Sequence, residues 1–233
     1  MKILITLLLC LSFTNLQAQE NADYYNITSS AVTLEDSQEA PLAPVTQKKK
    51  TLFPYVSKNK VNAELAEYES DLDTIISMGT KIYKIIEAGK PVVSREDAVW
   101  KLLPKVSGQE VDEMDLEGWY SPAYRKYHLE LKNLYGMVVV SLRYTINYTY
   151  GGQYEGKGRY LTGVEIRHED LLVRWGYNFS AKAIRVSIVN HGTKQNPVVG
   201  MTLKLSTVVK TVMNESQRDY TYHVKGDGSF QEM

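Results

Sequence analysis

Cysteine is almost absent from this sequence, and the single one present, Cys10, lies near the N-terminus. Cys10 belongs to an apolar run, residues 3–13, that follows the positively charged Lys2. The small residue Ala18 lies a few positions beyond this run. A positive residue, a short apolar run and a small residue before a cleavage point are the pattern of a secretory signal peptide. We therefore predict that residues 1–18 are removed on export.

Once the signal peptide is removed, the chain contains no cysteine. It then has no disulfide, no thiol nucleophile and no cysteine ligand for a metal. Leu9 rather than a small residue precedes Cys10, and the apolar run continues past it, so we do not expect lipidation of this cysteine. An exported chain without disulfides favours a bacterial envelope. The predicted location is periplasmic or secreted, with the outer membrane as the alternative.

The sequence also lacks an excess of either charge and, beyond residue 18, any long hydrophobic run. Lysine and arginine together number 27, and aspartate and glutamate also number 27. A chain without net positive charge has little attraction for a polyphosphate backbone, so nucleic acid is not an expected partner. No later apolar run reaches the length of a membrane-spanning helix. One basic cluster, Lys48-Lys49-Lys50, would allow peripheral contact with a membrane.

Catalytic and metal-binding motifs are missing as well. The histidines show no His-x-His or His-Glu-x-x-His spacing, and the sequence has no Gly-x-Ser-x-Gly elbow and no phosphate-binding loop. The acidic stretch GQEVDEMDLEGW, residues 108–119, lacks the ligand spacing of a calcium loop. We therefore predict no cofactor, no bound metal and no enzymatic activity. The alternative is a hydrolase whose dispersed carboxylates and histidines converge only in the fold.

Tyrosine, in contrast, is abundant, with 17 residues against 4 phenylalanines and 3 tryptophans. Tyrosine favours strands and half-buried surfaces. From Pro91 onward, apolar and polar residues alternate in stretches that are separated by turn residues such as glycine and asparagine. We predict strands at residues 92–101, 123–132, 136–150, 158–168, 171–179, 182–190, 199–213 and 219–225.

The part of the chain before these strands has different patterns. Residues 19–60 lack periodicity and are rich in serine, threonine, proline and mixed charge, which predicts a flexible leader. In residues 61–90, apolar positions recur at spacings of three and four, which indicates one stripe of a helix that ends near Gly89 and Pro91. The stripe consists of Leu65, Tyr68, Leu72, Ile75, Gly79, Ile82 and Ile86.

Together these patterns predict a mainly β protein: an antiparallel β-sandwich with one N-terminal amphipathic helix packed against it, over residues 61–230. The clearest strand, residues 136–150, carries one face of valine, leucine, isoleucine and tyrosine. This face could pack against a second sheet, against lipid around an integral outer-membrane β-barrel, or against a ligand. Short strands such as 182–190 and the polar ending GDGSFQEM favour the sandwich, and the barrel is the alternative.

Aromatic residues indicate where a binding site would lie. The stretch GWYSPAYRKYH places aromatic rings beside Arg125 and Lys126, and such rings can stack on sugars or pack against a protein. They could instead fix a loop to one end of the sandwich. A further tyrosine lies in GGQYEGKG, residues 151–158, which we interpret as a hairpin loop. The predicted binding residues are Trp119, Tyr120, Tyr124, Tyr127 and Tyr154.

The function predicted from these observations is that of an exported, non-enzymatic cell-envelope protein. Its β-sandwich would serve as a binding or assembly module for a protein or glycan partner in the envelope. The sequence identifies neither the partner nor the oligomeric state. Alternation along the strands indicates how the sheets pack, but it does not indicate a function.

Overall fold

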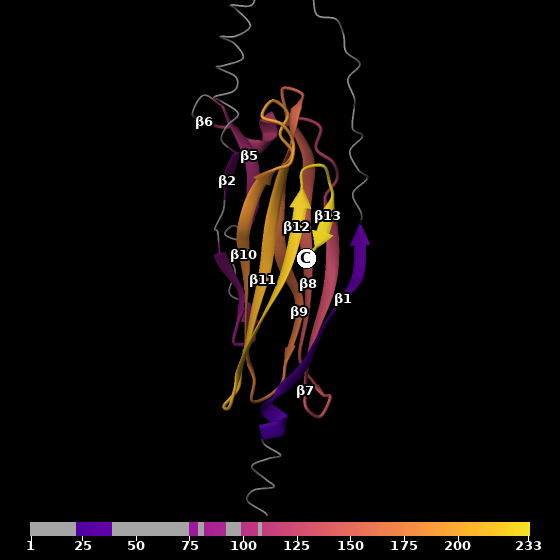
Figure 1. Cartoon of the computed structure of the whole chain (residues 1–233), viewed down its shortest axis with the longest axis vertical. Helices are drawn as coiled ribbons and strands as arrows, with labels where there is room; N and C mark the ends of the chain where they lie inside the picture. The colour runs from indigo at the N-terminus through magenta and orange to yellow at the C-terminus, as the bar shows by residue number, and fades with distance from the viewer. Residues whose placement is uncertain (1–21, 39–74, 79–81, 92–98, 107–108) are drawn as a thin grey trace, which may run out of the picture.

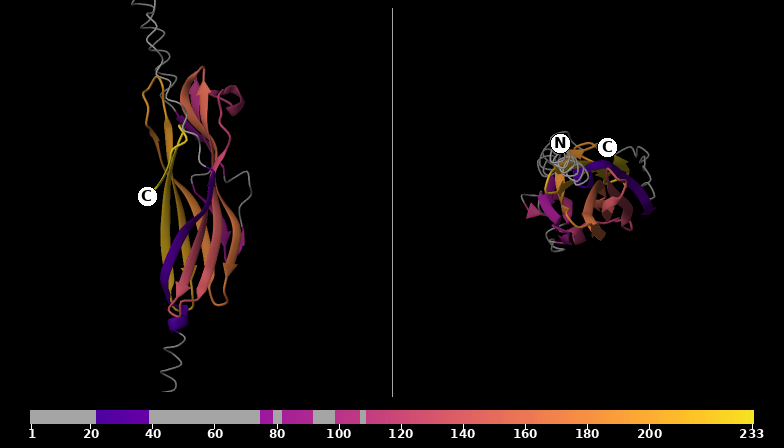
Figure 2. Two further views of the ribbon diagram at one scale, coloured as in Figure 1. Left: turned by 90° about the vertical axis from the view of Figure 1, so that its right-hand side faces the viewer. Right: turned by 90° about the horizontal axis from the view of Figure 1, so that it is seen from below.

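Two antiparallel β-sheets lie face to face and form the body of the protein (Figure 1). The computed structural model describes residues 22–38, 75–78, 82–91, 99–106 and 109–233. Seen from the side, the sheets form two layers along an elongated molecule (Figure 2). The mainly β architecture predicted from the alternation is confirmed, and the two sheets agree with a sandwich.

The strands of both sheets are long and pair in antiparallel ladders. From edge to edge, the first sheet contains β1 (Ile27–Gln38), β7 (Ala123–Asn133), β8 (Val138–Tyr154), β9 (Lys157–Val173), β5 (Trp100–Val106) and β2 (Ile75–Met78), and β6 (Gln109–Glu110) also pairs with β5. The second sheet contains β13 (Phe230–Glu232), β12 (Glu215–Lys225), β11 (Val199–Lys210), β10 (Asn178–Asn190), β3 (Ile82–Glu87) and β4 (Lys90–Pro91).

Helical structure is minor in the described residues. It consists of a single turn at residues 22–25 and the short 3-10 helix η1 (Glu113–Asp115). None of the described helical segments has the length and apolar character needed to cross a membrane. The predicted signal peptide, residues 1–18, lies outside the described residues.

The apolar face of β8 is buried between the two sheets. Successive side chains of a strand point to opposite faces, so every second residue of β8 faces the interior. The residues on this face have at most 2% of their surface exposed, and they are Val140, Leu142, Tyr144, Ile146, Tyr148 and Tyr150. The second sheet contributes the equally buried Phe179, Ala181, Ala183, Leu203, Leu205 and Tyr222 to the same core.

Hydroxyl groups of buried tyrosines connect the two sheets. The hydroxyls of Tyr144 in β8 and Tyr222 in β12 lie 2.5 Å apart. Tyr83 in β3 donates to the carbonyl of Ile166 in β9 at 3.3 Å and accepts from its N–H at 3.2 Å. Tyrosine therefore supplies both apolar area and a directional bond across the core.

Two further tyrosines of the first sheet reach the C-terminal hairpin of the second. Tyr148 donates to the carbonyl of Gly228 at 3.1 Å, and Tyr127 donates to the carboxylate of Glu232 at 2.7 Å. The rings of Tyr127, Tyr144 and Tyr222 also contact one another, with centroids 5.2 to 6.4 Å apart. Burial raises the pKa of each of these three phenols well above 10, so all three remain neutral near pH 7.

The predicted amphipathic helix is wrong for every part of residues 61–90 that the structure describes. Residues 75–78 form β2 in the first sheet, and residues 82–87 form β3 in the second. Isoleucine is frequent here, and its branched side chain favours strands over helices. In β3, Ile82 is 49% exposed whereas Tyr83 and Ile85 are buried. Of the predicted stripe, Ile75, Ile82 and Ile86 lie in these two short strands, and the other four residues lie outside the described residues.

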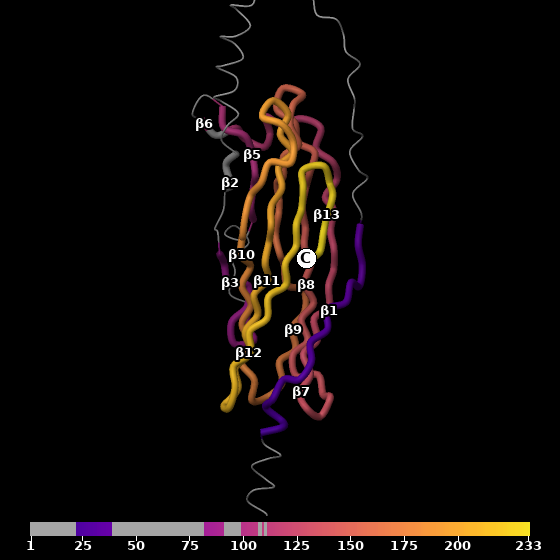
Figure 3. The backbone as a smooth tube through the Cα atoms, viewed as in Figure 1, coloured from indigo at the N-terminus to yellow at the C-terminus, as the bar shows by residue number. Residues whose placement is uncertain are grey.

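The predicted flexible leader is also wrong where the structure describes it. Residues 27–38 form β1, which pairs along β7 at the edge of the first sheet (Figure 3). Only three residues of β1 are partly buried, so its sequence shows no alternation. Main-chain bonds hold it in place, with help from Tyr124 donating to Asp36 at 3.0 Å and Arg143 to Glu35 at 3.1 Å.

Most strand predictions after residue 120 are confirmed, but three predicted strands, 158–168, 171–179 and 182–190, correspond to only two, β9 and β10. The predicted strand 171–179 is split, because β9 ends at Val173 and β10 begins at Asn178. The charged stretch Arg167 to Asp170, which resembles a turn in the sequence, lies inside β9. Its acidic side chains have partners on β8: Glu169 accepts from Thr145 at 2.5 Å, and Asp170 pairs with Arg143 at 3.2 Å. The predicted strand 92–101 lies largely outside the described residues.

The paired hydroxyls of Tyr144 and Tyr222 predict a non-additive effect on stability. Tyr144→Phe or Tyr222→Phe alone leaves one buried hydroxyl without a partner, and we expect each to lower the free energy of unfolding by about 1–2 kcal/mol. The double variant removes both groups, so its cost should be well below the sum of the two. Urea denaturation of the four proteins measures this coupling. Tyr120→Phe, on a half-buried ring, serves as a control and should have little effect; additive costs would contradict the pairing.

Candidate functional site

The structure separates the five predicted binding residues into three environments. Trp119 and Tyr120 lie side by side in the segment before β7, partly exposed and packed on the end of β8. Tyr124 and Tyr127 are on opposite faces of β7: Tyr124 bonds to Asp36 of β1, and Tyr127 is buried in the core. Tyr154 is the last residue of β8 and is partly buried against the core. Among the five, we therefore retain Trp119 for a candidate site.

Two glycines of β8 provide the surface on which Trp119 and Tyr120 pack. A Cβ atom added to Gly152 would lie 2.4 Å from the Trp119 ring, and one added to Gly151 would lie 2.4 Å from the Tyr120 ring. Only glycine permits such a close approach of ring to backbone. Tyr120 also stacks in parallel on Tyr150, with ring centroids 4.9 Å apart. The structure thus supports the interpretation in which aromatics fix a loop to one end of the sandwich.

Main-chain hydrogen bonds align this aromatic segment with β8. Glu117 and Gln153 exchange two bonds of 2.8 Å, and the N–H of Tyr120 donates to the carbonyl of Tyr150 at 3.0 Å. The stretch 151–158, predicted to be a hairpin loop, belongs mostly to β8 and β9. Only Glu155 and Gly156 form the turn, with φ angles of 49° and 71°, as a two-residue hairpin turn of type I′ requires.

A groove with a volume of about 370 Å³ opens beside Trp119. Residues from three strands of the first sheet, β5, β8 and β9, and from the 3-10 helix η1 surround it. Its lining is mainly apolar, with a charged pair and two threonines at one side. The lining residues are Val99, Lys101, Glu113, Met114, Trp119, Thr149, Thr162 and Gly163.

Glu113 organises the polar side of this groove. One carboxylate oxygen lies 3.1 Å from the Nζ of Lys101, and the other accepts from the hydroxyl of Thr162 at 2.6 Å. The backbone carbonyl of Glu113 accepts from the indole N–H of Trp119 at 3.1 Å. The bond from Thr162 and, to a smaller extent, the charge of Lys101 hold the pKa of Glu113 below its ordinary value. This carboxylate is therefore ionised and charge-compensated at neutral pH.

Sequence reasoning missed most of the groove. In the sequence, Glu113 and Met114 are part of an acidic stretch without a ligand-binding motif. Lys101, Thr149 and Thr162 belong to no motif that would indicate a binding site. Thr149 and Thr162 are partners across the β8–β9 ladder next to a shift in its register, and Gly163 follows with a positive φ of 62°. A glycine inside a strand can mark such an irregularity, and it is the one clue that the sequence offered.

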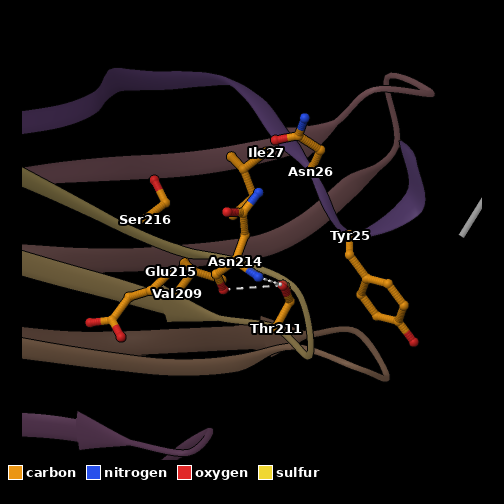
Figure 4. Close-up of a pocket in the computed structure, with 8 residues that line it drawn as sticks. All are labelled: Tyr25, Asn26, Ile27, Val209, Thr211, Asn214, Glu215 and Ser216. Atoms are coloured by element: carbon orange, nitrogen blue, oxygen red, sulfur yellow. Dashed lines mark hydrogen bonds between the residues drawn. The ribbon is translucent and has the colours of Figure 1, made fainter. Parts of the chain in front are cut away.

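A second cavity lies at the opposite end of the sandwich, between the start of β1 and the turn that joins β11 to β12 (Figure 4). It has a volume of about 220 Å³. Thr211 and Asn214 on its wall bond to each other, since the Thr211 hydroxyl donates to the Asn214 carbonyl and accepts from the Asn214 N–H. The ring of Tyr25 points away from this pair. These polar groups stabilise the turn, and few donors or acceptors in the cavity remain for a ligand.

Two histidines form the third group of interest. The Nε2 atoms of His191 and His223 lie 2.9 Å apart, and the Nδ1 of His223 lies 2.9 Å from the hydroxyl of Thr202. The short distance between the two Nε2 atoms requires one proton between them. Within the described ranges, no group of three or more His, Cys, Asp or Glu side chains is placed to hold a metal ion, so this pair has no third ligand of that kind.

Comparison of the chain with known protein families, with curated proteins and with solved structures finds no match. A candidate function must therefore be argued from the geometry of the sites themselves.

The histidine pair predicts that the fold loses stability in mild acid. Burial and the neighbouring His191, followed by Lys225, hold the pKa of His223 below 6.5, whereas Asp227 acts in the opposite direction. The unfolded chain therefore binds a proton at higher pH than the folded chain does. Stability from this group is complete above about pH 6.5 and falls as the pH drops from there through the lowered pKa of the folded state.

Urea denaturation between pH 8 and pH 5 measures this effect. His223→Asn should reduce the slope of stability against pH relative to the wild type. Equal slopes in the wild type and His223→Asn would contradict the assignment.

Proposed function

We propose that the protein is an exported, non-enzymatic cell-envelope module that binds a glycan in the groove beside Trp119. The N-terminal pattern of Lys2, the apolar run 3–13 and Ala18 supports export. The observation that carries the proposal is the indole of Trp119, which packs closely on Gly152 and donates to the carbonyl of Glu113, beside the ion pair of Glu113 and Lys101.

The chemistry of the groove matches a sugar better than a purely apolar ligand. A sugar ring has an apolar face of C–H groups, which can lie against an aromatic ring, and an edge of hydroxyl groups. Val99 and Met114 extend the apolar wall beside Trp119. Lys101, Glu113 and Thr149 present donors and acceptors to the hydroxyl edge. A few polar groups in an otherwise apolar concave site give a ligand its orientation.

Hydrolysis of the bound glycan is the alternative that the groove supports less well. Glycoside hydrolases of the common type use two carboxyl groups, one of which must be protonated to act as the acid. Among the described residues that line the groove, Glu113 is the one carboxylate, and its lowered pKa keeps it ionised. A group that already accepts from Thr162 and pairs with Lys101 acts more readily as an anchor for hydroxyl groups than as a proton donor.

A glycan array tests the proposal with two matched tryptophan variants. The purified protein is applied to oligosaccharides prepared from bacterial envelopes, and the affinity of each retained glycan is measured by calorimetry. Trp119→Ala should weaken binding by roughly tenfold or more, because the loss of one stacked ring costs on the order of 1.4 kcal/mol. Trp175→Ala, at the opposite end of the sandwich, should bind as the wild type does.

Two outcomes would contradict the proposal: a wild-type protein that retains no glycan, and a loss of affinity that is equal in the two variants. Release of reducing sugar from a retained glycan would favour the hydrolase alternative, and Glu113→Gln would then be expected to abolish it.

A further inference from the structure

The end of the sandwich opposite to the Trp119 groove exposes a cluster of apolar side chains. Three hairpin turns lie at this end, joining β7 to β8, β9 to β10 and β11 to β12 (Figures 1 and 3). Six of the thirteen exposed large apolar side chains of the described residues lie on these turns: Leu134, Tyr135, Met137, Trp175, Val212 and Met213. We call these six residues the apolar tip.

The most exposed members of the apolar tip have no packing role that explains them. Trp175 is 83% exposed, Val212 81% and Met213 57%. Leaving a large apolar side chain in water forgoes about 1.5–3 kcal/mol relative to burying it. Apolar residues scattered singly over a surface are ordinary, but a cluster drawn from three separate turns marks a place of interaction.

The backbone of the apolar tip is held firmly by the helical turn at residues 22–25. Tyr24 donates to the carbonyl of Trp175 at 3.2 Å and accepts, at its own carbonyl, from the hydroxyl of Tyr177. The N–H of Leu134 donates to the carbonyl of Asn26 at 3.1 Å. These bonds fix the main chain at two of the three turns without using a side chain of the apolar tip, and the third turn is closed by the bonds between Thr211 and Asn214.

The shape and charge of this end favour a lipid surface over a protein. The exposed residues lie on three separate short turns, whereas protein interfaces are broad and complementary. The nearby charges are balanced in number. Lys210 pairs with Glu215 at 2.9 Å and Lys132 with Glu130 at 3.6 Å. Arg174, whose Nε donates to the carbonyl of Val138 at 2.7 Å, is offset in number by Asp23 of the helical turn. Tryptophan, tyrosine and aliphatic residues on a nearly neutral surface are suited to the boundary between headgroups and acyl chains.

The course of the chain places this same end next to the membrane during export. The turn at residues 22–25 lies at the apolar tip, and residues 14–21 span at most about 30 Å even when fully extended. The apolar run 3–13 precedes them. While the predicted signal peptide is attached and its apolar run lies in a bilayer, the turn at residues 22–25 can lie no farther than about 30 Å from that bilayer.

We propose that the apolar tip inserts its exposed side chains into the outer layer of a lipid bilayer, and that it binds lipid through apolar contact and not through charge. The protein would then lie with its long axis away from the membrane and the Trp119 groove at its far end. This inference does not depend on the glycan proposal, because it concerns different residues at the opposite end of the sandwich.

Quenching of Trp175 fluorescence by brominated phosphatidylcholine vesicles tests the insertion. Trp119→Phe provides the background, since Trp100 is fully buried and Trp175 is then the one accessible indole among the described residues. We expect Trp175 emission to shift to shorter wavelength and to be quenched, with little dependence on salt or on added anionic lipid. Because quenching reports contact of Trp175 itself, the result holds whether or not the apolar run 3–13 is still attached.

Variants at the two ends of the molecule provide the comparison. In vesicle co-sedimentation of the chain recovered after export, Trp175→Ser combined with Val212→Ser should lower the partition coefficient at least about tenfold. Val189→Ser removes an exposed apolar side chain at the other end of β10, outside the groove, and should leave it unchanged. Circular dichroism shows whether each variant is folded.

Three results would overturn the proposal. The first is a Trp175 that vesicles neither shift nor quench. The second is binding that requires anionic lipid and disappears at high salt, which would assign it to charge. The third is a blue shift that depends on protein concentration without vesicles, which would assign the apolar tip to contact with a second copy of the chain.

Discussion

The arrangement of the two sheets depends on tyrosine side chains whose hydroxyls find partners across the core. A buried hydroxyl without a partner is costly, so each tyrosine placed in the interior restricts where the opposite sheet can lie. Tyr144 must meet Tyr222, and Tyr83 must reach the main chain of Ile166. A core of phenylalanine in the same places would pack but would lack these directional bonds between the sheets. The tyrosines thus define one register between the sheets.

This fixed register allows the two ends of the same strands to serve different purposes. β8 runs the length of the first sheet, from the turn that carries Met137 to the glycines beneath Trp119. At one end, position 152 is a glycine, and the absence of a side chain there lets the indole of Trp119 lie against the backbone beside the pair of Glu113 and Lys101. At the other end, short turns display apolar side chains on a base held by residues 22–25. The long rigid core keeps the two regions apart.

The sequence predicted the parts of the fold in which one face of a strand is buried and the other is wet. The alternation from Val138 to Tyr150 is regular because each second residue enters the core. The prediction failed for β1, whose edge position leaves nearly all of its side chains in water and its place fixed by main-chain bonds. It failed for β2 and β3 because two four- to six-residue strands can reproduce helical spacing by accident.

The candidate site was predictable only in part. A cluster of aromatics singled out Trp119, but the same criterion selected Tyr127, whose ring is buried in the core. Glu113, Lys101 and Thr162 come from three elements that only the pairing of the strands brings together. The spacing of these residues along the chain does not indicate that their side chains are in contact. The exposure of Trp175 could not be predicted from the sequence either, because Trp175 lies in an alternating stretch that is typical of a strand with one buried face.

Titration of tyrosine ionisation by ultraviolet absorbance tests the central role of the paired hydroxyls most directly. Burial raises the pKa of Tyr83, Tyr127, Tyr144 and Tyr222 far above the ordinary value of 10. We predict that exposed tyrosines ionise first while circular dichroism remains native, and that the buried ones ionise together in one cooperative step as the fold opens. Gradual ionisation of all 17 tyrosines in a protein that stays folded would contradict a core held together by their hydroxyls.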